Sequence, residues 1–373
     1  MRKAAFIYDP VQSTYVMRED HVFTFTRLQL TFDLLQSYGA FELPSSLLLA
    51  PRKAEEEEIL SFHTPEYLEA VKSLSRGEEG INPGDFNFSD YGDTPPYEGM
   101  YEASALGVGA SLLAAELVTS GEVDVAFNIS GGLHHAAPNY ASGFCVFNDV
   151  VIAILSLVKK GLRVAYIDID AHHGDGVQNA FYQSDRVLNI SFHEWGRYLF
   201  PGTGDVGEIG SGSGLGYSVN LPFHPYADDQ IYLWAFREIV PPLVQSFEPD
   251  IVVTQLGCDA HYLDTLSHFV LTTEGYIQLI KEIRQLAPKW VALGGGGYDM
   301  GAVARTWTLA YGLMMDHDWP DEIPPQFQEH YGLKTLRDHV QLALDDKVKE
   351  QAHLFAQSRV EELKKTIFPF FRT

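Results

Sequence analysis

The sequence predicts an α/β protein with a single open, mostly parallel sheet and helices on both faces. Apolar runs rich in Val, Ile and Tyr recur along the chain, and each is followed by a polar Gly/Asp/His cluster and a helix-like stretch. This alternation is typical of βαβ units. The runs AFIY, VAYIDI, IVVTQL and WVAL are almost continuously apolar. Parallel strands that are covered on both faces have this composition.

The predicted elements follow in chain order. The apolar runs predict strands at residues 3–8, 124–129, 163–169, 186–192, 250–256 and 290–294. The stretches between them predict helices at residues 103–120, 147–160, 228–246, 273–286 and 301–314. Residues 316–373 are polar and helical in pattern, so we expect an extension that packs on the outside. No Pro/Ser-rich linker interrupts residues 1–315, and a single domain is expected over residues 1–373.

The chain is strongly acidic, because 26 Lys and Arg face 50 Asp and Glu, for a net charge of −24. Nucleic acid and anionic membranes are also negative, and no basic patch is visible, so we expect no direct nucleic-acid binding and no membrane association. No apolar run of about 18 residues is visible, so we expect no secretion signal and no membrane-spanning segment. The two cysteines, Cys145 and Cys258, favour a reduced, cytoplasmic setting.

Polar clusters follow several of the predicted strands, where ligands of open α/β sheets bind. These clusters are SGGLHH at 130–135, DIDAHHGDG at 168–176, GCDAH at 257–261 and GGGGYD at 294–299. In an extended chain residues two apart point the same way, so Asp168, Asp170 and His172 can converge on one side. Asp259 can then close a set of three ligands with an open position, as in catalytic zinc sites; iron would also be tolerated.

Each of these residues also has an ordinary structural interpretation. A single Asp at a strand end is usually a helix cap, and a single buried His is usually only hydrogen-bonded. However, five Asp and His residues lie within residues 168–175, and so many ionisable groups would be costly to bury without a metal. The cluster therefore favours a metal site.

His134 and His135 add an imidazole pair that can take and give protons near pH 7. Asp168 and Asp175 are the carboxylates available to fix the tautomers of the two rings. Tyr298 follows four glycines that lack the spacing of a phosphate loop, and its hydroxyl can donate to a developing oxyanion. The alternatives are two capping or core histidines and a packed aromatic ring.

The segments GGLHHA, DIDAHHGDG, FPGTGD, GCDAH and GGGGYD, in this order and spacing, resemble the histone deacetylase superfamily over about residues 1–315. The likeness is greatest to its bacterial acetoin-utilisation and histone-deacetylase-like members. The resemblance implies an arginase/deacetylase-like fold and a metal-dependent amidohydrolase that removes acetyl groups from lysine Nε in proteins or peptides. An amidohydrolase for acetylpolyamines or other small amides is the alternative, and a non-enzymatic reader of acetyl-lysine is disfavoured.

The resemblance also implies roles for individual residues. Zinc, with Fe²⁺ as the alternative ion, would be held by Asp170, His172 and Asp259. His134 and His135 would be the paired bases, backed by Asp168 and Asp175, and Tyr298 would polarise the acetyl carbonyl. The implied substrate-binding residues are the tunnel walls Phe144 and Phe200, the adjacent Gly143, Leu266 at the rim, and Asp93 as a rim carboxylate.

Two structural sites for K⁺ or Na⁺ are implied by the same resemblance. The first would use Asp168, Asp170, His172, Ser191 and Phe192. The second would use Phe181, Ser184, Val187 and Tyr217. Arg27 is expected to line an internal cavity below the metal.

Overall fold

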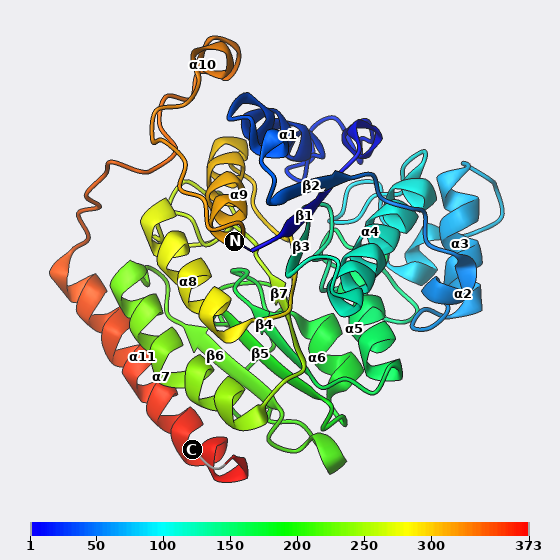
Figure 1. The fold of residues 1–373 in the computed structure, drawn as a ribbon. Coiled ribbons are helices and arrows are strands. Elements are labelled where there is room, and N and C mark those ends of the chain that lie inside the picture. Colours follow the sequence, from blue (N-terminus) through cyan, green and yellow to red (C-terminus); the bar gives the residue numbers. More distant parts are fainter. Residues whose placement is uncertain (1, 372–373) are drawn as a thin grey trace.

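The computed structural model describes residues 2–371. Its centre is one open eight-stranded sheet in the order β2-β1-β3-β8-β7-β4-β5-β6, and every strand pair is parallel (Figure 1). The predicted fold class is therefore confirmed. The strands are β1 Ala4–Ile7, β2 Ser46–Leu49, β3 Val125–Asn128, β4 Val164–Asp168, β5 Val187–Glu194, β6 Ser218–Phe223, β7 Ile251–Gln255 and β8 Trp290–Leu293.

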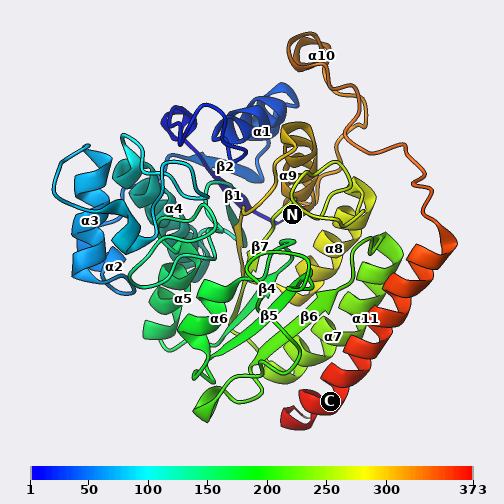
Figure 2. The same cartoon turned by 180° about the vertical axis from the view of Figure 1, so that it is seen from behind.

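Helices cover both faces of this sheet. They are α1 Thr26–Ser37, α2 Glu56–Ile59, α3 Pro65–Ser75, α4 Met100–Ser120, α5 Asp149–Lys159, α6 Asp175–Phe181, α7 Asp229–Phe247, α8 Thr273–Leu286, α9 Met300–Met314, α10 Pro325–Tyr331 and α11 Asp346–Thr366. Helices α4, α5 and α6 lie on one face, and α1, α7, α8, α9 and α11 lie on the other (Figures 1 and 2).

Successive strand residues contribute to opposite faces, as the two-residue period of a strand requires. In β4, Ala165 and Ile167 belong to the core under α7 to α9, and Val164 and Tyr166 belong to the core under α4 to α6. Both sets are fully buried. This double burial explains why the central strands are continuously apolar in the sequence.

The two strands that the sequence did not predict, β2 and β6, are the edges of the sheet. Strand β2 is only partly buried, and in β6 the polar Ser218 and Asn220 separate the apolar residues, so neither strand has a continuous apolar run. In β6 the run Ser218–Phe223 contains Pro222, which an edge strand tolerates because its missing N–H is not needed for a second partner. Helices α1, α3 and the short α6 were also missed.

Helix α4 is long and apolar enough to cross a membrane by length and composition alone. Most of it is nevertheless buried inside the protein, against β3, α3 and α5. We therefore interpret it as a core helix.

The chain after α9 forms an extension along the outside of the molecule, drawn in orange and red in Figure 1. Helix α10 lies near α1, and α11 lies along α7 and the edge strand β6. An edge strand that is covered in this way is protected from pairing with other chains.

Candidate active site and metal centre

Four neighbouring strands deliver the polar clusters to one edge of the sheet. β3, β8, β7 and β4 are adjacent and parallel, so their carboxyl ends lie side by side. The polar clusters that the sequence placed after these strands therefore meet. This edge is where an open α/β sheet binds its ligands.

Asp170, His172 and Asp259 come together in this region as the sequence predicted. Asp170 and His172 follow β4, and Asp259 follows the neighbouring β7. His172 Nδ1 lies 3.1 Å from Asp170 Oδ1 and 2.9 Å from Asp259 Oδ2. One potential ligand atom from each residue lies within 4.8 Å of the others, and all three residues are buried. This group can hold a metal ion.

Backbone donors aim the two carboxylates. The N–H of Gly296 donates to Asp170 Oδ2 at 2.8 Å, and the N–H of Ala171 donates to Asp259 Oδ1 at 2.7 Å. The other oxygen of each carboxylate is left facing His172 Nδ1. A Cβ on Gly296 would lie 2.2 Å from Asp259 Oδ2, so only glycine fits at this position. The loop after β8 therefore packs closely against both carboxylates.

The electrostatics of these groups also suit a cation. Burial and then the neighbouring Asp170 carboxylate raise the pKa of Asp259 to about 8. Two buried carboxylates side by side repel each other, and a divalent cation would remove this repulsion. One imidazole nitrogen and two carboxylate oxygens match the donors that zinc and iron accept, with room for a further ligand.

His134 and His135 form a close pair in which the rings meet edge-on, with centroids 4.1 Å apart, and each ring has its own carboxylate. His134 Nδ1 lies 2.7 Å from Asp168 Oδ2, and His135 Nδ1 lies 2.7 Å from Asp175 Oδ1. The two Nε2 atoms are 3.0 Å apart. Because each carboxylate accepts the Nδ1 proton, the two Nε2 atoms can share one further proton. His134 Nε2 also lies 3.9 Å from Asp170 Oδ1, so the pair borders the metal group.

The pKa values of the two histidines are shifted in opposite directions. Burial opposes protonation of His134, but the carboxylates of Asp168 and Asp170 raise its pKa to about 9. Burial and then the charge of His134 lower the pKa of His135 to about 4. The pair therefore combines a ring that holds a proton with a ring that has a free lone pair.

Tyr298 follows the glycines after β8 and is held by its backbone. Its N–H donates to Asp264 Oδ2 at 2.7 Å. Burial and then the charges of Asp259 and Asp170 raise the pKa of the Tyr298 hydroxyl well above its usual value. The hydroxyl therefore keeps its proton at neutral pH and remains a hydrogen-bond donor.

Aromatic side chains surround the histidine pair and Tyr298. Phe200 meets His135 edge-on with ring centroids 5.1 Å apart, and Phe144 meets Tyr298 edge-on at 5.7 Å. Gly143 packs against the His135 and Phe200 rings. A Cβ at this position would lie 2.4 Å from the His135 ring and 2.9 Å from the Phe200 ring, so a larger residue would not fit. Phe200 is 42% exposed, so this aromatic group reaches the surface.

Two predicted rim residues lie on surface loops. Asp93 is exposed, and its carbonyl lies 3.1 Å from Nε2 of the buried His21. Leu266 is half-buried on the loop after β7, and its N–H donates to Asp264 Oδ1 at 3.0 Å. Their contact with a substrate stays a prediction.

Some members of the two sets predicted to bind K⁺ or Na⁺ are neighbours in the fold, and ion binding by either set stays a prediction. In the first set, Asp168 and Ser191 are register partners of β4 and β5. In the second, the Phe181 carbonyl accepts a hydrogen bond from the Ser184 N–H at 2.9 Å, and the Tyr217 carbonyl accepts one from Asn189 at 2.9 Å. A carbonyl oxygen has a second lone pair, so this geometry is compatible with a cation.

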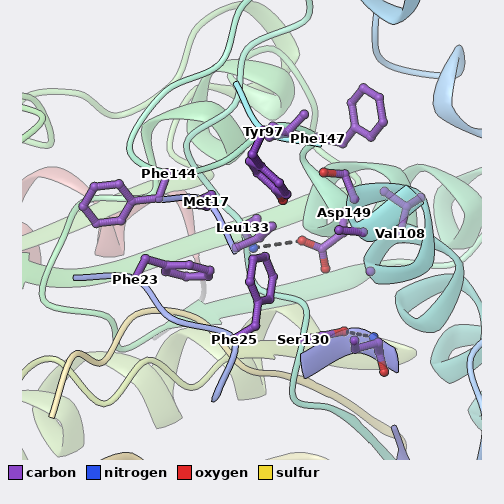
Figure 3. Close-up of a pocket in the computed structure, with 15 residues that line it drawn as sticks. Met17, Phe23, Phe25, Tyr97, Val108, Ser130, Leu133, Phe144, Phe147 and Asp149 are labelled. Carbon is purple, nitrogen blue, oxygen red and sulfur yellow. Dashed lines mark hydrogen bonds between the residues drawn. The ribbon is translucent and has the colours of Figure 1, made fainter. Parts of the chain in front are cut away.

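A largely apolar pocket lies on the inner side of this region (Figure 3). Its wall includes Leu133, which precedes the histidine pair, and the buried Asp149 at the start of α5. Asp149 accepts hydrogen bonds from the N–H groups of Gly132 at 3.0 Å and Leu133 at 2.8 Å, which fixes the histidine loop. The lining residues are Gln12, Met17, Phe23, Phe25, Tyr97, Ala103, Ser104, Gly107, Val108, Ser130, Leu133, Phe144, Val146, Phe147 and Asp149.

Arg27 is not among the residues that line this pocket, and its predicted place at an internal cavity below the metal stays a prediction. Its guanidinium lies 4.3 Å from the centre of the Phe23 ring, and Phe23 itself lines the pocket. Arg27 Nη1 donates to the Gly297 carbonyl at 2.9 Å. Its contact is therefore with the backbone of the glycine loop before Tyr298.

The sequence did not single out several residues that orient the site. The Tyr166 hydroxyl donates to Asp168 Oδ2 at 2.7 Å, and Gln255 Nε2 donates to Asp170 Oδ2. Asp264 holds Tyr298. Gln255 could have been found, because an amide at the end of the apolar run IVVTQL must be buried and needs partners.

Comparisons with known proteins agree with this geometry. A family model for the histone deacetylase domain matches residues 21–314. The acetoin utilization protein AcuC of Bacillus subtilis (strain 168) is 43% identical over 334 residues, 88% of this chain and 86% of that protein. Histone deacetylase 1 of Homo sapiens is 37% identical over 335 residues, 89% of this chain and 68% of that protein.

Solved structures show the same fold. The crystal structure of an HDAC homolog from Aquifex aeolicus has a TM-score of 0.87 and 30% identity, over 96% of this chain and 100% of that chain. A structure of an HDAC homolog complexed with SAHA has the same TM-score and identity, over 97% of this chain and 100% of that chain. The chain belongs to the histone deacetylase family of metal-dependent hydrolases.

Proposed function

We propose that this protein is a zinc-dependent deacetylase that hydrolyses acetyl groups on the Nε of lysine in proteins or peptides. The observation that carries the proposal is the arrangement of His134 and His135. Each ring is backed by its own carboxylate, and the pair borders the group formed by Asp170, His172 and Asp259. A buried ligand group alone would suit a structural metal, whereas an adjacent proton-transfer pair is what hydrolysis requires.

Zinc held by Asp170, His172 and Asp259 would polarise the acetyl carbonyl and lower the pKa of a bound water. A free Nε2 lone pair of the histidine pair takes the proton from the attacking water. The proton that the pair holds is then delivered to the nitrogen of the leaving amine. Acetate and a free lysine amine result. Asp168 and Asp175 keep both rings in the tautomer that leaves Nε2 available.

Tyr298 stabilises the negative charge that develops on the acetyl oxygen. Its hydroxyl keeps its proton, and its backbone is fixed by Asp264, so the donor is in place before the charge appears. Phe144, Gly143 and Phe200 form the walls for the apolar stem of the lysine, with Leu266 and Asp93 at the rim. The sets around Asp168 and Phe181 hold K⁺ or Na⁺ as structural ions.

The test of this proposal is Tyr298→Phe, assayed on an acetyl-lysine peptide with the zinc-loaded enzyme. We expect kcat to fall about a hundredfold or more, because one oxyanion donor is removed. Zinc content, measured by elemental analysis, should stay at the wild-type level because Tyr298 is not a ligand.

The matched control is Tyr262→Phe, which removes a hydroxyl from the loop after β7 but not from the site. It should retain wild-type kcat. Full turnover by Tyr298→Phe would refute the role of this hydroxyl, and no turnover by the wild-type enzyme with zinc bound would refute the deacetylase proposal.

A second candidate is the hydrolysis of acetylated polyamines. The net charge of −24 suits this candidate as it suits a lysine-containing peptide, since a negative surface attracts cationic substrates. The two candidates are separated by kcat/KM for an acetyl-lysine peptide and for an acetylated polyamine. A polyamine value that is higher by an order of magnitude would favour the second.

A further inference from the structure

The extension after α9 makes contacts with two loops of the candidate active site. The histone deacetylase family model ends at residue 314, so these contacts come from outside the segment that it matches. One contact is made by Asp338, which lies between α10 and α11, and the other by Phe355 on α11. The two loops are residues 259–268 and residues 195–200.

Asp338 is buried among donors that belong to the body of the protein. Its side chain is only 3% exposed, and it accepts hydrogen bonds from Arg305 Nη1 at 2.6 Å and from the Thr273 N–H at 2.8 Å. The Asp338 N–H in turn donates to Thr273 Oγ1 at 2.8 Å. A carboxylate with this number of partners is a fixed anchor and not a surface group.

The third partner of Asp338 is His261, two residues after the metal-binding candidate Asp259. His261 Nε2 lies 2.8 Å from Asp338 Oδ2, and the His261 side chain is fully buried. Because the carboxylate accepts the Nε2 proton, Nδ1 is left free to accept from the Leu263 N–H at 3.2 Å. Asp338 therefore fixes both the orientation and the tautomer of His261.

The turn that begins at His261 leads directly to the residue that holds Tyr298. The N–H of Asp264 donates to the His261 carbonyl at 2.8 Å. The Asp264 carboxylate accepts from the N–H groups of Tyr298 at 2.7 Å and Leu266 at 3.0 Å. A continuous series of short contacts thus joins the extension to the oxyanion donor and to the rim.

Phe355 supports the opposite wall. Its ring lies 5.0 Å from the ring of Trp195, measured between centroids. The Trp195 carbonyl accepts from the N–H of Tyr198 at 2.8 Å, which closes the turn that leads to Phe200. Phe200 in turn meets His135.

We propose that the C-terminal extension is a positioning element of the active site, with Asp338 and Phe355 as positioning residues. Asp338 fixes the 259–268 loop, which contains Asp264, the residue that accepts the Tyr298 N–H. Phe355 packs against the turn that contains Phe200. Neither residue touches the reacting atoms. The kinetic part of this inference rests on the proposed function, whereas the structural part does not.

The first experiment compares Asp338→Asn with Asp345→Asn in the full-length, zinc-loaded enzyme. Asp345 lies on the same extension, but its carboxylate accepts the Lys347 N–H at the start of α11, whereas that of Asp338 contacts His261 in the 259–268 loop. We expect Asp338→Asn to lower kcat roughly tenfold to a hundredfold on an acetyl-lysine peptide, because a displaced Tyr298 donates poorly. KM and zinc content should change little, and Asp345→Asn should match the wild type.

The second experiment compares Phe355→Ala with His353→Ala. It tests the proposal independently, even where Asp338→Asn does not fold. Both remove a ring from α11, but His353 packs on Trp234 of α7 and not on the active-site turn. We expect Phe355→Ala to raise KM with kcat retained, because Phe200 is placed along the substrate stem. Wild-type KM in Phe355→Ala would overturn this arm of the proposal.

Amide hydrogen exchange tests positioning without any turnover. In Asp338→Asn, peptides that cover residues 261–268 and 296–299 should exchange faster than in the wild type and in Asp345→Asn. Faster exchange confined to residues 321–340 would overturn the proposal. If the wild-type enzyme did not deacetylate lysine, the proposed function would fail, but this exchange pattern would still decide whether the extension positions the site.

Discussion

His63 shows by contrast what distinguishes the histidines of the site. It is 2% exposed, and its partners are backbone groups: Nε2 accepts from the Asn148 N–H at 3.0 Å, and Nδ1 lies 3.3 Å from the Pro138 carbonyl. No carboxylate supports a second proton, and burial lowers its pKa to about 4. His134 and His135 each have a carboxylate behind the ring. The ring alone therefore does not define a proton-transfer residue.

The buried neutral state of His63 predicts a specific loss of stability in acid. In the unfolded chain the pKa of His63 is about 6.5. Below this pH the His63 ring binds a proton in the unfolded state but not in the folded state. Stability should fall as the pH drops from about 6.5 towards 4, by up to about 3 kcal/mol from this residue. Urea unfolding at pH 7.5 and pH 5 should therefore show a smaller difference in His63→Gln than in the wild type.

The control for this measurement is His330→Gln on the exposed side of α10. It should keep the wild-type difference between the two pH values. Equal pH dependence in His63→Gln and the wild type would show that His63 does not contribute.

Residues of the site could be predicted where the backbone alone determines their direction. Asp170 and His172 are two apart after a strand, and this spacing was enough to expect convergence. Gln255 and Asp264 were missed because their roles depend on tertiary neighbours that local spacing does not encode. The contacts of Arg27 with the Phe23 ring and the Gly297 carbonyl likewise depend on side-chain packing that local spacing does not encode.

At the scale of elements, α4 approaches the segment before α2 unusually closely. The Ala54 N–H donates to the Ala105 carbonyl at 2.9 Å. A Cβ on Gly109 would lie 1.9 Å from the Arg52 carbonyl oxygen, whereas a Cβ on Gly107 would lie 3.6 Å from the Ser130 carbonyl oxygen. Close packing therefore requires a glycine at position 109, whereas position 107 has room for a Cβ.

This difference predicts opposite effects of the same substitution within one helix. Gly109→Ala should destabilise the protein by about 1–3 kcal/mol, because the Arg52 segment must move. Gly107→Ala should be neutral or stabilising by up to about 1 kcal/mol, because alanine favours the helix. Thermal and urea unfolding of both variants measure this, and equal stability of the two would contradict the close contact.

The burial of each strand explains which elements could be predicted from the sequence. Central strands such as β4 and β7 are buried on both faces, so their apolar runs stand out. The edge strands β2 and β6 were not recognised because Ser218, Asn220 and Pro222 interrupt the apolar pattern of β6, and β2 is only partly buried. Helix α1 follows the alternating segment at 22–26, which obscures its helical period.

At the scale of the whole molecule, folding has to bury Asp170 and Asp259 side by side within a chain whose net charge is already −24. Neighbouring backbone donors compensate part of this cost through the Gly296 and Ala171 N–H groups. The site still disfavours ionisation of both carboxylates, as the raised pKa of Asp259 shows, and a bound cation would remove this cost. Metal binding and global stability should therefore be coupled.

Chelation should consequently lower the melting temperature of the protein, and added zinc should restore it. A ligand at about a thousand times its dissociation constant stabilises the folded state by about 4 kcal/mol, which is ample for a clear shift. Asp259→Asn supplies the control, because it weakens the ligand set and also removes the carboxyl group whose ionisation the folded state disfavours. This variant should no longer respond to the chelator, and it should melt above the metal-free wild type. If it melted below the metal-free wild type, the carboxylate repulsion would not be a significant cost, and the coupling would have to arise from ligand geometry alone.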